Sequence, residues 1–208
     1  MTPELASVAG GAVLVWRLEV PLLTISSSPL GGGLGLRHWV LNATVPDGYA
    51  RRDPDVHLTE LARSLGLAGE GAGFLTAVDV RDVVHRSEGG VRASVTAGVG
   101  AHPTWAAAPD PVAAAGPGTI NAVCFSAVRL SEAALVNAVA TIAEAKAQAL
   151  WEAGVPGTGT STDATAVLCP ADGPAEPFGG PRSPVGGALA RVVHSAVSAA
   201  LPDRRLSR

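Results

Sequence analysis

The sequence predicts an α+β fold: a single domain with a mixed or mainly antiparallel sheet, packed by two long C-terminal helices and a shorter one. The chain has 208 residues, which suits one domain with a large core. Hydrophobic residues make up 47% and charged residues 16%, so much of the chain can be buried. The predicted strands precede or flank the long helices instead of alternating strictly with them, which favours α+β over a doubly wound fold. We expect one domain over residues 1–208, with residues 1–8 and 202–208 frayed.

The first half of the chain is predicted to supply most of the strands and the shorter helix. Apolar, β-prone runs predict strands at Ala12–Trp16, Leu22–Ser26, Trp39–Val45 and Phe74–Val78. Leucines recur at helical spacing within Val56–Leu65, which predicts a helix there. Polar and apolar residues alternate along Val91–Val99, so this segment and Val80–His85 are expected to form a hairpin around Ser87–Gly90.

The second half is predicted to contain the two long helices. The expected elements are a strand at Gly118–Leu130, a helix at Ser131–Gly154, a strand at Thr165–Cys169 and a helix at Val185–Leu201. Ser131 is a suitable N-cap, Glu132 suits the positive end of the helix dipole, and Gly154 provides an end to the first helix. The Ala/Pro-rich segment His102–Pro117 is expected to be a variable loop that could hold a lid, with Trp105 as its anchor.

Lys146 interrupts the apolar face of the first long helix. Leu135, Val139, Ile142 and Leu150 cluster on this face at 100° per residue, and Lys146 projects from its middle. One interpretation is a long stem that carries the amine out to water. The other is a desolvated amine with a lowered pKa, which would be useful as a base or an oxyanion partner.

The segment Gly154–Ala164 is a Gly/Thr-rich loop that contains Asp163 near its end. Small residues allow backbone N–H groups to approach a ligand closely, and the hydroxyl groups and Asp163 add polar atoms. The loop is not a P-loop, because no Gly-Lys-Ser/Thr follows it.

Several segments in a fixed order resemble one enzyme family. The runs ATIAEAKAQAL and GTGTSTDA look like the signature of the adenosylcobinamide amidohydrolase family. The further matching segments are SSSPLGGG (Ser26–Gly33), NATVPDGY (Asn42–Tyr49), GFLTAVDV (Gly73–Val80), EGGV (Glu88–Val91), GTIN (Gly118–Asn121) and EPFGGPRS (Glu176–Ser183). The resemblance implies a corrinoid-salvage enzyme that hydrolyses the amide between the corrin ring and its aminopropanol arm, giving adenosylcobyric acid.

Amide hydrolysis needs an attacking oxygen, stabilisation of the carbonyl oxygen and an acid for the leaving amine. The sequence has no Gly-x-Ser-x-Gly elbow, and its spacing does not reveal a Ser–His–Asp set. The catalytic candidates are therefore Asp163, Glu144, Lys146, Thr160 and Thr162. Asp163 or Glu144 would activate water, or Thr160 or Thr162 would attack directly, while Lys146 would tune the base or hold the oxyanion. Because Glu144 and Lys146 lie on nearly opposite sides of the helix, one of them should be structural.

The resemblance also directs attention to polar residues that could hold the corrinoid. The substrate-binding candidates are Ser26, Ser27, Gly31, Gly32, Asn42, Asn121 and Arg182. The first four belong to a loop of three serines and three glycines, the two asparagines lie in predicted strands, and Arg182 lies in a turn-rich loop.

Composition argues against several other classes of protein. The formal net charge of −3 leaves no basic footprint for nucleic acid. No signal peptide, membrane-spanning run or zinc-binding motif is evident, so we expect a cytoplasmic protein with no metal and no cofactor. Cys124 and Cys169 are expected to be buried reduced thiols. A corrinoid small molecule is the expected partner, and a homo-oligomer is possible.

Two other functions remain open at this stage. The same Gly, Ser and Thr loops would serve a corrinoid-binding protein without turnover. Alternatively, SSSPLGGG and GTGTSTD would be phosphate-binding loops of a small-molecule transferase.

Overall fold

The computed structural model describes residues 1–100, 103–108 and 118–201, and these form an eight-stranded mixed sheet with three α-helices. The strands are β1 (Glu4–Val8), β2 (Gly11–Ser26), β3 (Gly33–Thr44), β4 (Gly71–Thr76), β5 (Val84–Glu88), β6 (Val91–Gly98), β7 (Thr119–Ser126) and β8 (Ala164–Cys169). The helices are α1 (Pro54–Ser64), α2 (Glu132–Glu152) and α3 (Pro184–Ala200). The predicted α+β class is confirmed, and the sheet is mixed rather than purely antiparallel. No helix in the described ranges is long and apolar enough to cross a membrane.

The strand order is β4-β3-β2-β8-β7-β6-β5, and β1 pairs separately with β2. The β3–β4 and β7–β8 pairs are parallel, while the other pairs are antiparallel. β2 joins the two halves of the sheet: residues 13–17 and 22–26 both pair with β3, but a bulge lies between them. Because a bulge bends a strand and increases its twist, β2 can pair with β1 before the bulge and with β8 after it.

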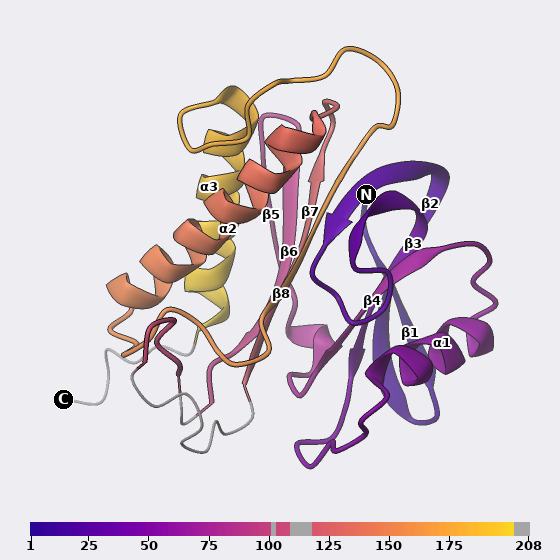
Figure 1. Ribbon diagram of the computed structural model, residues 1–208. Coiled ribbons are helices and arrows are strands. Elements are labelled where there is room, and N and C mark those ends of the chain that lie inside the picture. The colour runs from indigo at the N-terminus through magenta and orange to yellow at the C-terminus, as the bar shows by residue number, and fades with distance from the viewer. Residues whose placement is uncertain (101–102, 109–117, 202–208) are drawn as a thin grey trace.

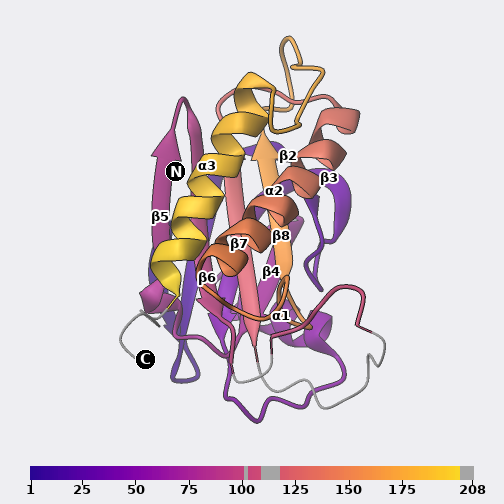
Figure 2. The same cartoon turned by 90° about the vertical axis from the view of Figure 1, so that its left-hand side faces the viewer.

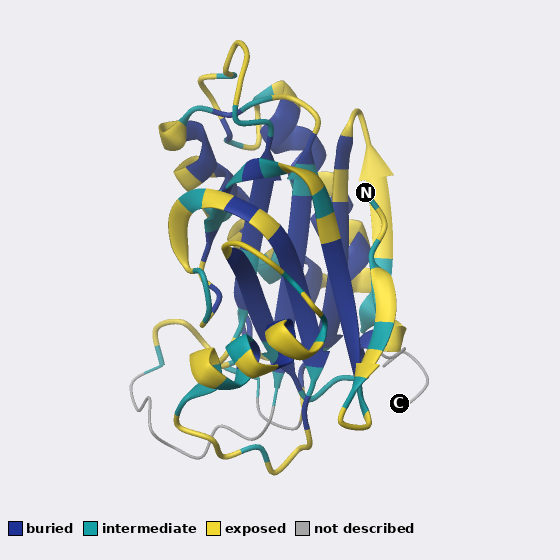
Figure 3. Ribbon diagram, turned by 90° about the vertical axis from the view of Figure 1, so that its right-hand side faces the viewer, coloured by how far each residue is buried: buried dark blue, intermediate teal, exposed yellow. Residues whose placement is uncertain are grey.

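The two halves of the sheet face each other, and helices cover their outer sides (Figure 1). Helices α2 and α3 lie over β6, β7 and β8, as the turned view shows most clearly (Figure 2). On the far side, α1 packs on β2 and β3, and Figure 3 shows its outer surface exposed above buried strands. The core between the halves joins side chains of both, including Trp16, Val40, Phe74, Val123 and Leu168. Each such side chain stabilises the fold by about 1.5–3 kcal/mol through burial of apolar surface.

Helix α2 begins and ends where the sequence predicts. The Ser131 hydroxyl accepts a hydrogen bond from Ala134 N, and Glu132 is in the first turn. The helix ends before Gly154, which has φ +70°. Near the C-terminal half of α2, Lys146 contacts Asp163 at the end of the Gly/Thr loop.

Several strands differ from the sequence-based prediction. Residues 1–8 were expected to fray, but Glu4–Val8 pairs with β2 because Ala9 and Gly10, both with positive φ, make a tight two-residue turn. The two short strands predicted on either side of Pro21 form one bulged strand, and β3 begins earlier, at Gly33. Val80–Asp82 is a 3₁₀ turn, so the hairpin partner β5 starts at Val84. Residues 202–208 and most of the expected lid, residue 102 and residues 109–117, lie outside the described residues.

Candidate active site

The Gly/Thr loop connects α2 to β8 and lies beside the first residues of β7. Thr104 pairs with it on one side: Thr104 N donates to Gly159 O at 2.8 Å, and Thr158 N donates to Thr104 O at 2.9 Å. Asp163 lies at the other end of the loop, immediately before β8. The loop is therefore held at both ends.

Asp163 receives four hydrogen bonds from three directions. Ile120 N at 2.9 Å and Thr160 Oγ1 at 2.5 Å contact its Oδ1, while Lys146 Nζ at 2.5 Å and Thr160 N at 3.0 Å contact its Oδ2. A carboxylate has about four lone-pair sites, so these donors use its acceptor capacity. Asp163 thus ties the loop to β7 and to α2 at once.

Lys146 forms an ion pair with Asp163 on the α2 side of the sheet. The two side chains are 19% and 13% exposed, so water screens their attraction only in part. Gly159 packs against the pair: a Cβ at this position would lie 2.6 Å from Lys146 Nζ and would overlap Asp163 Oδ2. Lys146 therefore neither reaches bulk water freely nor stands unpaired in an apolar pocket.

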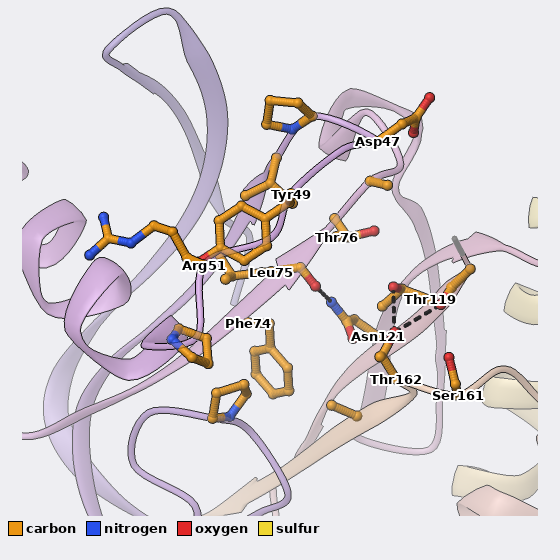
Figure 4. A pocket seen from close by; sticks show the side chains of 17 residues that line it. Asp47, Tyr49, Arg51, Phe74, Leu75, Thr76, Thr119, Asn121, Ser161 and Thr162 are labelled. Carbon is orange, nitrogen blue, oxygen red and sulfur yellow. Dashed lines mark hydrogen bonds between the residues drawn. The ribbon is translucent and has the colours of Figure 1, made fainter. Parts of the chain in front are cut away.

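Two cavities lie on opposite sides of the loop. The smaller, about 170 Å³, lies on the α2 and α3 side and is lined by Ser27, Lys146, Asp163, Thr165 and apolar residues. The larger, about 510 Å³, lies between the two halves of the sheet (Figure 4) and includes Tyr49, Phe74, Thr119, Asn121 and Thr162 in its lining.

Five of the segments that carry the family resemblance meet at the larger cavity. The residues that they contribute are Pro29; Asp47 and Tyr49; Phe74, Leu75, Thr76 and Ala77; Gly118, Thr119 and Asn121; and Ser161, Thr162 and Ala164. Along the chain these segments are separated by tens of residues, and the pairing of β3 with β4 and of β7 with β8 brings them together.

A pair of threonine hydroxyls lines this cavity (Figure 4). Thr162 Oγ1 lies 2.8 Å from Gly118 O and 2.9 Å from Thr119 Oγ1. A carbonyl oxygen can only accept, so Thr162 donates to Gly118 O and Thr119 donates to Thr162. One lone pair of Thr162 Oγ1 is left without a donor among these contacts.

Three hydrogen-bonded polar side chains, Asn121, Asn42 and Thr96, extend from the wall of the larger cavity into the protein core. Asn121 Nδ2 lies 3.0 Å from Leu75 O and 3.1 Å from Asn42 Oδ1, and Asn42 Nδ2 lies 3.0 Å from Thr96 Oγ1. Asn121 lines the cavity, whereas Asn42 and Thr96 lie behind it. Asn42, a predicted substrate-binding residue, contacts Asn121 and is not among the residues that line this cavity.

The rim of the cavity is formed by the segment after β3. Tyr49 stacks on His57 with ring centroids 5.5 Å apart, and its hydroxyl lies 3.0 Å from His57 Nδ1. Burial raises the pKa of Tyr49, so the phenol keeps its proton. Arg51, also on the rim, is held by Asp53 and Glu60.

The structure brings together some of the predicted catalytic residues and separates others. Lys146, Thr160 and Asp163 are in direct contact, and the hydroxyl oxygens of Thr160 and Thr162 each lie 2.8 Å from Gly118 O. Glu144 is exposed on the solvent side of α2, away from this group. The described ranges hold no group of three His, Cys, Asp or Glu side chains that could bind a metal ion.

The predicted substrate-binding residues are also divided. Ser27 lines the smaller cavity, whereas the Ser26 hydroxyl is buried and bonds Ser28. Gly31 and Gly32 have packing roles, since a Cβ at Gly31 would overlap Gly71 O and one at Gly32 would lie 2.7 Å from Ser28 O. Arg182 follows the far end of β8, a strand about 20 Å long, and is exposed there.

Sequence reasoning missed Thr119, Thr96 and Tyr49. Thr119 precedes Asn121 by two residues in a strand, so the two side chains share a face, which was a usable signal. Tyr49 follows the turn after β3, where binding residues often lie, but Thr96 could be found only from strand pairing.

Comparison with known proteins agrees with the resemblance. A family model described as adenosylcobinamide amidohydrolase matches residues 3–207. A protein of Methanosarcina mazei named adenosylcobinamide amidohydrolase is 32% identical over 187 residues, which cover 86% of this chain and 90% of the relative. A protein of the same name from Halobacterium salinarum is 35% identical over 199 residues, covering 91% of this chain and 85% of the relative.

Proposed function

The chain belongs to the adenosylcobinamide amidohydrolase family, and we propose on this premise that its reaction takes place in the 510 Å³ cavity between the two halves of the sheet. The enzyme hydrolyses the amide that joins the corrin ring of adenosylcobinamide to its aminopropanol arm and produces adenosylcobyric acid. Water adds across the C–N bond: the carbonyl carbon gains an oxygen, and the amine leaves with a proton.

The observation that carries this location is the convergence of five resembling segments on one cavity. Its volume of about 510 Å³ lies in the range of small-molecule sites. It would hold the aminopropanol arm and the nearest edge of the corrin, with the rest of the ring at the open mouth near Tyr49.

Thr162 is the hydroxyl that we place next to the reacting carbonyl. It lines the cavity, and Gly118 O and Thr119 fix its oxygen. Thr162 would hold the attacking water, because its free lone pair can accept a hydrogen bond from that water; the water then supplies its oxygen to the carbonyl carbon and a proton to the leaving amine. Thr160 is less suited to this role, because its hydroxyl lies between Asp163 Oδ1 and Gly118 O.

We assign Lys146 and Asp163 positioning roles. Asp163 receives four hydrogen bonds, which leaves little capacity to accept a proton from water. The pair faces the smaller cavity and fixes the loop whose Ser161 and Thr162 face the larger one.

Substitution of Thr162 tests this location. Thr162→Ala should lower turnover of adenosylcobinamide at least a hundredfold while the corrinoid still binds, and Thr162→Ser should keep more activity because it keeps the hydroxyl. Turnover is followed by corrinoid mass and binding by absorbance titration. Thr59→Ala, on the exposed side of α1, is the control. Full activity in Thr162→Ala would contradict the proposal that the reaction takes place in this cavity.

The cavity offers little to a phosphate-transferring enzyme. Arg51 is the only Lys or Arg among the described residues that line it, and Asp53 and Glu60 already bind its guanidinium. A corrinoid-binding protein without turnover would bind adenosylcobinamide but release no aminopropanol.

A cytoplasmic location is part of the proposal. Cys124 and Cys169 are buried free cysteines, and burial raises the pKa of both thiols, that of Cys124 to about 12. Thiols in this state suit a reducing compartment.

A further inference from the structure

Asn121 lies in a chain of hydrogen bonds that joins four strands, β3 and β4 from one half of the sheet and β6 and β7 from the other. Asn121 on β7 is opposite Thr96 on β6, and Asn42 on β3 is opposite Phe74 on β4. The three polar side chains are at most 2% exposed: Asn42 2%, Thr96 1% and Asn121 1%. Buried polar groups of this kind are costly unless they are paired, so their geometry is constrained.

The Leu75 carbonyl fixes the direction of the whole chain. The two ends of an asparagine amide look alike in shape, but a backbone carbonyl can only accept. Leu75 O must therefore face the Asn121 Nδ2 group, at 3.0 Å. The same Nδ2 group donates to Asn42 Oδ1, and this leaves Asn42 Nδ2 to donate to Thr96 Oγ1.

This arrangement leaves one atom of the Asn121 amide for the cavity, its carbonyl oxygen Oδ1. Both hydrogens of Nδ2 are committed, while Oδ1 accepts no hydrogen bond from any described residue. Oδ1 also keeps a small accessible area, because the only fully buried side-chain polar atom without a partner in the described ranges is Arg129 Nε. Asn121 lines the large cavity (Figure 4), so we infer that this cavity is the space beside Oδ1.

A carbonyl oxygen fixed in this way selects a hydrogen-bond donor. The bond cleaved in the proposed function is a secondary amide, whose N–H is a donor next to the reacting carbonyl. We propose that Asn121 Oδ1 accepts a hydrogen bond from the N–H of the scissile amide, and that Asn42 and Thr96 are positioning residues that hold Asn121 in this orientation. The inference rests on the proposed function and adds to it a specificity for amide over ester.

The neighbouring hydroxyls fit this assignment. Thr119 and Thr162 line the same cavity, from the start of β7 and from the Gly/Thr loop. With the amide nitrogen directed at Asn121, the carbonyl carbon would lie toward Thr162. Asn121 would then hold the substrate by its amide N–H, while Thr162 would lie beside its carbonyl carbon.

The test compares the substrate with an ester analogue in which oxygen replaces the N–H of the arm. Dissociation constants of both are measured by absorbance titration in the Thr162→Ala background, so that the substrate is not cleaved during the titration. With Asn121 intact, the protein should bind the amide about tenfold more tightly than the ester, and with Asn121→Ala added it should bind the two about equally, as expected for one hydrogen bond. A tenfold preference that persists in Asn121→Ala would overturn the inference.

Thr96 provides a second test that leaves Asn121 unchanged. Thr96→Val removes the acceptor of Asn42 Nδ2, so it should reduce the preference for the amide, whereas Thr96→Ser should restore it. Ser94→Ala is the matched control, since Ser94 lies on the same strand but its hydroxyl contacts His85 and takes no part in the hydrogen bonds that hold Asn121. An unchanged preference in Thr96→Val would remove the positioning role of Thr96.

The inference and the proposed function can fail separately. Adenosylcobinamide that is bound but never cleaved would contradict the proposed function, and the ratio of dissociation constants would still test Asn121. Normal cleavage with an amide-to-ester ratio that does not depend on Asn121 would contradict the inference alone.

Discussion

Among individual residues, Asp163 has surroundings that its sequence-based interpretation did not include. An acid at the end of a Gly/Thr loop predicted a water-activating base, but four donors surround its carboxylate. A sequence cannot show these donors, because two are backbone N–H groups and one belongs to a helix 17 positions away. The same contacts explain why Lys146 interrupts an apolar helix face.

Asp163→Asn should destabilise the protein and loosen the loop. It leaves Lys146 without its counter-charge in a half-buried position, which should lower the free energy of unfolding by about 2–4 kcal/mol. Activity should fall with it, because the loop carries Thr162. Chemical denaturation and turnover assays measure the two effects. An Asp163→Asn variant with wild-type stability and no activity would instead support direct catalysis by the carboxylate.

Glu144 offers a matched comparison on the same helix. Glu144→Gln changes an exposed side chain of α2 and should alter stability by less than about 0.5 kcal/mol and leave turnover unchanged. Denaturation and turnover assays run beside Asp163→Asn check this. A large loss of turnover in Glu144→Gln would instead support a catalytic role for Glu144.

Among the elements, helices were predicted more closely than strands. The end signals of α2 are local, and the helix begins and ends within two residues of the prediction. The course of β2 is not a local property: Pro21 predicted a break, but pairing with β3 on both sides of the bulge keeps the strand continuous. β1 was missed because its pairing depends on a two-residue turn with positive φ at Ala9 and Gly10.

Gly159→Ala tests how closely the loop wraps the ion pair. An added methyl group would overlap Asp163 Oδ2 and approach Lys146 Nζ, so we expect a loss of about 1–3 kcal/mol in unfolding free energy. Gly48→Ala is the control, because a Cβ there meets nothing within 4 Å. Equal melting temperatures for the two variants would contradict the packing described around Gly159.

The contact between the β5–β6 turn and α3 should depend on pH. Arg191 holds the pKa of Glu88 below its ordinary value of 4.5, so the pair stabilises the fold above that value. The contribution is lost as the pH falls through the lowered pKa. Melting curves of the wild type and Glu88→Gln should therefore differ at neutral pH and converge in acid. A constant difference at all pH values would show that the ion pair is not its cause.

For the whole molecule, the fold class and the family could be predicted from the sequence, but the cavity could not. The resembling segments were visible, yet their meeting point depends on the bend at β2 and on the parallel pairs β3–β4 and β7–β8. Arg182 shows the reverse case: it lies in a resembling segment, but β8 carries that segment to the far end of the sheet. Long-range strand pairing therefore decides which of the candidate residues share a site.

The central claim is that this protein hydrolyses the aminopropanol amide of adenosylcobinamide. The most direct measurement is the mass of the corrinoid after incubation with purified protein in ¹⁸O-enriched water. We predict a product that has lost the aminopropanol arm and carries one ¹⁸O atom in its new carboxyl group, with loss of this product in Thr162→Ala. A corrinoid of unchanged mass, whether bound or free, would contradict the claim.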